Sequence, residues 1–252
     1  MNKSISAYPQ FMKHPFWDHL RLHSASTTFS QLVRLEESER KHVVCAAVEG
    51  FYPISYASLQ AFRRFSEIAP DAVSKEIARE IYLVEKGDKP LIKGSEMTGV
   101  LHCDQLKIMF ESLVEAQLPI ERPETFWVLH RADIPNASLT KTMAICDTIE
   151  NTAPYVIHFY QDFLIQCQLA MGISSEYLKR TYLDEHNLTE GDSCEDQHIE
   201  MINRMKGQCA HLTNTPEYET EQRRFSLLVE AHFEQCRLKI EQLLKKTGRG
   251  AA

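Results

Sequence analysis

A run of apolar residues from Ser38 to Ile68 constrains the fold of this chain more than any other feature. Apolar side chains recur in it at intervals of three and four residues, the spacing that places them on one face of a helix. Similar runs cover residues 71–87, 97–116, 139–171, 193–207 and 215–246, and no strand-like alternation persists. With only 9 glycines in 252 residues, an all-β or glycine-loop architecture is disfavoured. We therefore predict one all-α domain spanning residues 1–252, with about eight or nine helices.

Capping residues and prolines set the expected helix ends. Ser38 and Asp71 are predicted to cap the helices that follow them, and Pro216 suits the first position of a last helix. Pro53 and Pro154 fall inside long apolar runs, so each should kink its helix or split it in two. Such kinks can open space in a bundle core for a ligand or a metal. Two further helices are expected, over residues 9–23 and 174–186.

Charge and cysteine usage exclude several classes of protein. The net charge of −7 and the isoelectric point of about 5.9 argue against nucleic-acid binding, which requires an excess of positive charge. No apolar run is long enough to span a membrane, and the first residues, MNKSISAYPQ, lack the apolar segment of a secretion signal. Seven scattered cysteines without a C-x-x-C pair suit a reducing compartment. These features predict a cytoplasmic protein with neither a nucleic acid nor a membrane partner.

The segment from Tyr182 to Met201 is the first candidate for chemistry. It carries His186, Glu195 and His198 in short succession. The last two residues are three apart, so on a helix they share a face, and a Glu-x-x-His pair is how helical bundles hold non-haem iron. Asp196 would replace Glu195 if the helix register differed.

Other candidate ligands fall on separate predicted helices. Glu85 ends the third helix, His102 lies one turn into the fourth, and Glu150 lies midway along the run that contains Pro154. Carboxylates and imidazoles together suit Fe(II) or Mn(II). Glu80 and Glu96 remain alternatives to Glu85 as the first acid, and a satisfied core histidine is an alternative reading of His102.

Nucleophilic and cavity-lining residues form a further set. Cys146 or Cys167 could act as a nucleophile with Tyr155 or Tyr160 nearby, although their apolar neighbours favour a structural role. His158 and Asp162, four residues apart on an apolar helix, either pair with each other or line a cavity. We expect the cavity wall to contain Tyr52, Tyr56, Tyr155, His158 and Asp162.

Short motifs resemble the haem-oxygenase-like superfamily, which includes TenA-type thiaminases, the PqqC oxidase and di-iron oxidases. The stretch HPFWDHL at residues 14–20 is similar to the first-helix signature of that group, and so is the aromatic second helix with Phe51, Tyr52, Tyr56 and Phe62. The di-iron branch resembles this chain in the order of its ligands. On that resemblance the metal ligands would be Glu85, His102, Glu150, His186, Glu195 and His198.

The resemblance implies a fold and a function. The fold would be a bundle of about seven to nine helices around a central cavity. The function would be that of a homodimeric oxidase or oxygenase that holds two Fe(II) ions, with Mn as an alternative, and uses O2 on a small organic substrate. A metal-free TenA-like hydrolase of a pyrimidine-type molecule and a non-catalytic ligand-binding protein are the alternatives.

Two features of the chain depart from that pattern. A loop with Pro90 and Gly94 separates Glu85 from His102, and residues 187–193 separate His186 from Glu195. A centre with a single iron, a site that binds metal only when substrate is loaded, and a degenerate site therefore also fit the sequence.

Overall fold

The computed structural model describes residues 35–89, 99–120, 125–171 and 194–247. Within these ranges the chain forms eight α-helices and one 3₁₀ helix and contains no strand, which confirms the all-α prediction. The helices predicted over residues 9–23 and 174–186 lie outside the described residues, as do residues 90–98.

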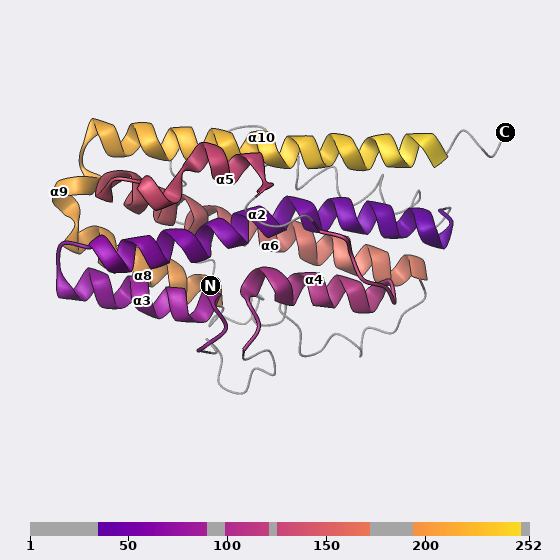
Figure 1. Cartoon of the computed structure of the whole chain (residues 1–252), viewed down its shortest axis with the longest axis horizontal. Helices are drawn as coiled ribbons and strands as arrows, with labels where there is room; N and C mark the ends of the chain where they lie inside the picture. Colours follow the sequence, from indigo (N-terminus) through magenta and orange to yellow (C-terminus); the bar gives the residue numbers. More distant parts are fainter. Residues whose placement is uncertain (1–34, 90–98, 121–124, 172–193, 248–252) are drawn as a thin grey trace, which may run out of the picture.

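Three long helices pack against one another through most of their length. They are α2 (Glu37–Ile68), α6 (Leu139–Met171) and α10 (Pro216–Thr247). Figure 1 shows α10 lying along α2, with α6 passing behind α2. The largest fully buried side chains include Phe62, Phe65 and Tyr160, and the ring of Tyr160 on α6 packs edge-on against Phe51 on α2 with centroids 5.4 Å apart.

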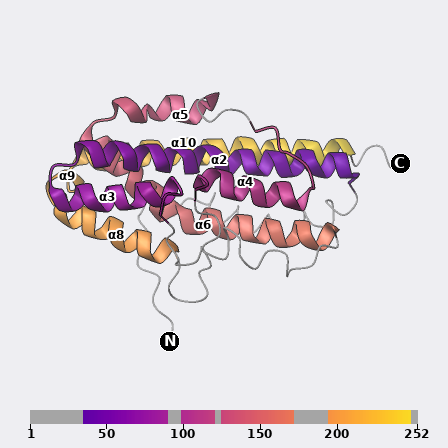
Figure 2. The same ribbon diagram turned by 60° about the horizontal axis from the view of Figure 1, so that its bottom comes forward.

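Shorter helices cover the remaining sides of this core. Helices α3 (Ala72–Glu85) and α4 (His102–Leu113) follow one another along α2, and Figures 1 and 2 both show their ends meeting near the middle of the bundle. Helix α8 (Cys194–Gln208) packs beside α3 and α6. The three smallest elements are α5 (Trp127–Ala132), η3 (Ile134–Asn136) and α9 (Ala210–Thr213).

Two prolines lie within unbroken helices. Pro53 is inside α2 and Pro154 inside α6, and neither splits its helix, which leaves a kink as the remaining prediction. A proline removes one backbone hydrogen bond from a helix interior and costs about 3 kcal/mol. Buried residues lie on both sides of Pro53, from Val43 to Phe65, and their packing offsets that cost.

The helix ends follow their capping residues, with one exception. Asp71 caps α3 as predicted, because its carboxylate accepts the backbone N–H of Ser74 at 2.8 Å. At the start of α10, Thr215 Oγ1 accepts the N–H of Tyr218 at 3.2 Å. Helix α2, however, is capped by Glu36 in a capping box rather than by Ser38, which lies inside the helix.

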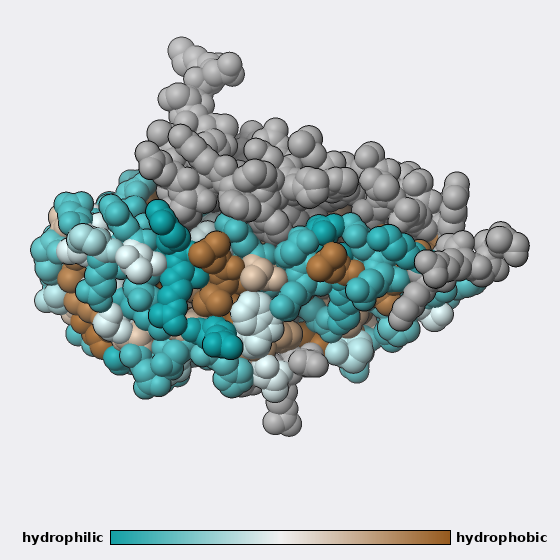
Figure 3. All heavy atoms as spheres, turned by 90° about the horizontal axis from the view of Figure 1, so that it is seen from above, coloured by the Kyte–Doolittle hydropathy of each residue, from teal (hydrophilic) through white to brown (hydrophobic). Residues whose placement is uncertain are grey.

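Helix α10 is amphipathic, with one face in the core and the other on the surface. Its inner face buries Phe225, Val229 and Phe233, whereas Leu227 and Leu238 are exposed. Figure 3 views the molecule from above Figure 1, the side on which α10 lies. On this face the described residues are mostly hydrophilic, with separated hydrophobic patches. Among the described helices, none has the length and hydrophobicity needed to cross a membrane.

A buried polar network joins α6, α8 and α10 at one end of the bundle. Asp147 is 1% exposed and accepts hydrogen bonds from Lys206 at 2.9 Å and from the Tyr218 hydroxyl at 2.6 Å. Gln222 donates to the same carboxylate. Burial and the neighbouring Asp147 raise the pKa of Tyr218, so its hydroxyl keeps the proton that it donates. One carboxylate therefore satisfies donors from two other helices.

We predict that Asp147→Asn lowers the free energy of unfolding by about 3 kcal/mol, because it leaves Lys206 without its counter-charge. Urea denaturation measures the change. Asp88→Asn is the matched control, since Asp88 pairs with Lys86 on the surface and such pairs contribute little. Equal stability losses in the two variants would show that the Asp147 network does not hold the helices together.

Candidate metal centre

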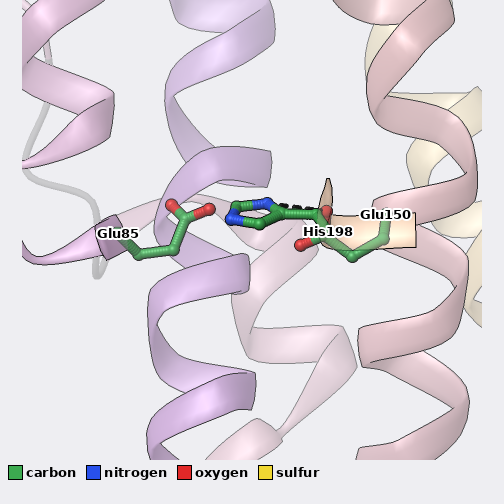
Figure 4. A group of neighbouring side chains, drawn as sticks. All are labelled: Glu85, Glu150 and His198. Carbon is green, nitrogen blue, oxygen red and sulfur yellow. Dashed lines mark hydrogen bonds and ion pairs between the residues drawn. The ribbon is translucent and has the colours of Figure 1, made fainter. Parts of the chain in front are cut away.

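Three ionisable side chains from three helices meet in the middle of the bundle. Glu85 comes from α3, Glu150 from α6 and His198 from α8, and one ligand atom of each lies within 4.8 Å of the other two. Their relative exposures are 6%, 2% and 2%, so all three are buried. Figure 4 shows the imidazole of His198 between the two carboxylates. This is the only group of three potential ligands that the described residues bring this close together.

Each carboxylate of the cluster faces a histidine. His198 Nδ1 lies 3.1 Å from Glu150 Oε2, within hydrogen-bond distance. The other ring nitrogen of His198 points toward Glu85 in Figure 4. Glu85 Oε2 lies 3.5 Å from His102 Nδ1, and among the described residues it has no hydrogen-bond partner. A buried carboxylate oxygen without a partner is costly, which points to a cationic ligand.

The junction between α3 and α4 places Glu85 next to His102. Helix α3 ends in a Schellman motif, in which the Gly87 N–H bonds to Val84 O and the Asp88 N–H to Leu83 O. Gly87 has φ +80°, a left-handed conformation that glycine adopts without strain. Its Cα lies so close to the next segment that an added Cβ would be 2.2 Å from Val100 O.

A cavity of about 40 Å³ adjoins the cluster. By this measure a water molecule needs roughly 10–15 Å³, so the cavity accommodates about three occupants of that size. Side chains from five helices line it: Phe51, Ile54, Ser55, Ser58, Glu85, His102, Ile149, Glu150, Thr152, Ala153, Val156, Ile157 and His198. Its polar groups are those of the cluster together with His102 and three hydroxyl side chains.

The geometry fits a divalent transition-metal ion. Oxygen and nitrogen ligands lie about 2.0–2.2 Å from such an ion, so donor atoms around it are separated by roughly 3–4.4 Å. The ligand atoms of the cluster all lie within 4.8 Å of one another, so none of their distances exceeds this range by more than about 0.4 Å. Two buried histidine–carboxylate pairs without metal are the alternative, but they leave Glu85 Oε2 without a hydrogen bond.

Several predicted ligands can now be compared with the structure. Three of the six predicted ligands come together in the structure: Glu85, Glu150 and His198. A fourth, His102, lies next to Glu85. His102 is the first residue of α4, not one turn inside it as predicted. Glu80 is largely on the surface and pairs with Lys89, which favours Glu85 as the first acid.

The side chains of the other predicted site residues are not described. His186 and Glu96 lie outside the described ranges altogether. For Cys167 in α6, and for Glu195 and Asp196 in α8, the structure describes only the backbone. The same holds for Tyr155, His158 and Asp162, whose backbone lies in α6. Their roles as ligands or wall residues stay predictions.

Two tyrosines expected in the cavity wall belong to α2. The Tyr52 hydroxyl donates to Asp104 Oδ1 at 2.6 Å, which links α2 to α4. Tyr56 is partly buried and packs against the hydrophobic core. Neither is among the residues that line the 40 Å³ cavity, so their place in a substrate pocket stays a prediction.

The environment of Cys146 favours a structural role. Its side chain is fully buried, and burial raises the pKa of its thiol well above 9.0. The carboxylate of Glu150, one helical turn away, raises it further. A nucleophilic cysteine needs a lowered pKa and access to the substrate. Tyr160, proposed as its partner, instead donates its hydroxyl to Ala47 O on α2.

Ser58 was not among the predicted site residues, although it lines the cavity and its buried Oγ has no protein hydrogen-bond partner. The signal was present: Ile54 and Phe62 lie four residues before and after it, so Ser58 is a polar residue on an apolar helix face.

Comparisons with known proteins give no relative. No protein-family model, no curated protein and no solved structure matches this chain. The evidence for function therefore comes from the site itself.

We predict that Gly87→Ala destabilises the protein by more than about 2 kcal/mol, because alanine at positive φ is strained and its Cβ meets Val100 O. Thermal unfolding measures the loss. Gly99→Ala is the matched control: Gly99 also has positive φ, +91°, but no atom of the described residues lies within 4 Å of an added Cβ. It should cost only the backbone strain of about 1–2 kcal/mol. If Gly87→Ala is as mild as Gly99→Ala, the close approach of the two segments is wrong.

Proposed function

We propose that this chain is a non-haem iron oxidase or oxygenase that uses O2 on a small organic substrate. The convergence of Glu85, Glu150 and His198 in the bundle core carries this proposal. Mixed carboxylate and imidazole ligands suit Fe(II), and iron bound in this way supplies the redox chemistry of O2 activation. The order of the ligands along the chain, which resembles the di-iron branch, supports the same function.

Each residue of the cluster would contribute to metal binding in a different way. Glu85 offers a carboxylate oxygen that no described group hydrogen-bonds, so it is the most direct anionic ligand. Contact between His198 Nδ1 and Glu150 Oε2 fixes the orientation of the imidazole. Burial of all three excludes bulk water and strengthens their attraction for a cation.

The described ligands account for one ion. A second ion, as the resemblance implies, would need His186 and Glu195 in addition to His102. A stoichiometry of two irons per chain would favour the di-iron form of the proposal, and a stoichiometry of one the mononuclear form.

Metal loading tests the proposal. Protein treated with a chelator and then given Fe(II) without oxygen should bind it and unfold at a higher temperature, by about 5–10 °C at a hundredfold excess of metal over the dissociation constant. The variants Glu85→Gln and His198→Ala should lower iron affinity by more than about 100-fold, because each removes a proposed ligand and changes of groups behind the ligands already cost roughly 10–100-fold.

Two surface variants serve as controls. Glu80→Gln lies on the same helix as Glu85 but on the surface, and His211 is exposed on α9, so Glu80→Gln and His211→Ala should bind iron as the parent protein does. Iron-loaded protein should then consume O2 when its substrate is supplied. Unchanged iron binding in Glu85→Gln and His198→Ala, or no iron binding by the parent protein, would refute the proposal.

A further inference from the structure

Ser58 is the one hydroxyl in the described part of the cavity wall that is fully buried and lacks a protein partner. Its relative exposure is 2%. Serines and threonines inside helices usually bond to the carbonyl four residues earlier, as Thr148 does with Ala144 and Ser112 with Ile108. Ser58 forms no such bond, so its hydroxyl is available to the cavity.

The position of Ser58 on α2 directs it toward the cluster. Phe51, Ile54 and Ser58 follow one another at intervals of three and four residues, and all three line the cavity. Glu85 lines the same cavity from α3, and its Oε2 is the other buried oxygen there without a hydrogen bond. Two unsatisfied oxygens from different helices thus border one space of about 40 Å³.

A small oxygen ligand explains both atoms. Buried waters typically form about three hydrogen bonds to buried polar groups that would otherwise lack partners. The cavity has room for one ion and about two water-sized molecules. The apolar lining, including Phe51, Ile54 and Val156, offers such a ligand few other polar contacts.

We propose that Ser58 is a positioning residue whose hydroxyl holds a water molecule, or another ligand of that size, at the open position of the metal centre. This inference rests on the proposed function, since it assigns the side of the metal that Glu85, Glu150 and His198 leave open. Ser58 does not touch the metal: its hydroxyl bonds to the small ligand. The organic substrate would then approach from outside this cavity.

Cobalt(II) is a suitable probe, because the intensity of its visible spectrum changes with the number of ligands. Replacement of the hydroxyl in Ser58→Ala should weaken Co(II) binding about tenfold, as measured by competition with a coloured chelator. It should also change the Co(II) spectrum. The variant Ser58→Thr keeps the hydroxyl, so it should restore both affinity and spectrum.

The metal-free protein provides a second, independent readout. Without a metal to hold the small ligand, the Ser58 hydroxyl is unpaired and destabilising, so metal-free Ser58→Ala should unfold about 2–4 °C above the parent protein. Ser226→Ala is the matched control: Ser226 is equally buried at 2%, but it lies on α10 and its hydroxyl donates to Glu230 Oε1 at 3.5 Å. That variant should show no gain in stability and no change in Co(II) affinity or spectrum.

The outcomes separate this inference from the proposed function. If the parent protein binds Co(II) and Ser58→Ala matches it in affinity and spectrum, the role of Ser58 is wrong while the metal site stands. A lower unfolding temperature for metal-free Ser58→Ala would also overturn it, since the hydroxyl would then have a partner in the protein. Failure of the parent protein to bind either Co(II) or Fe(II) refutes the metal site and the inference together.

Discussion

Burial of ionisable side chains in an apolar core is the constraint on which this structure depends. Glu85, Glu150 and His198 are each at least 94% buried, and a carboxylate removed from water without compensation costs several kcal/mol. Glu150 is compensated in part by its contact with His198. Glu85 Oε2 has no hydrogen bond from the described residues. A bound cation would satisfy both carboxylates together, and the three side chains lie close enough to hold one.

Two of the ionisable residues in the core lie at helix ends rather than within helices. Glu85 is the last residue of α3 and His102 the first of α4, and the turn through Gly87 brings these ends together along α2. The Asp147 network holds α8 against α6, one helical turn from Glu150. Packing of the three long helices supplies the stability that permits a polar centre within the core.

The sequence predicts most helices well because their signals are local. Asp71, Gly87 and Pro216 set helix ends that the structure confirms, and the run over residues 139–171 is a helix with those bounds. Local patterns could not decide between Glu80 and Glu85, since that depends on which face of α3 meets α2 and α8. The sequence also could not predict that the Ser58 hydroxyl lacks a partner, because this depends on which side chains the other four helices place around it.

Diffraction from crystals of iron-loaded protein, recorded on both sides of the iron absorption edge, tests the central claim most directly. An anomalous peak within about 2.5 Å of a carboxylate oxygen of Glu85 and the imidazole of His198 is the predicted result. A structure without that peak, in which Glu85 instead accepts hydrogen bonds from protein groups alone, would contradict a metal centre in this bundle.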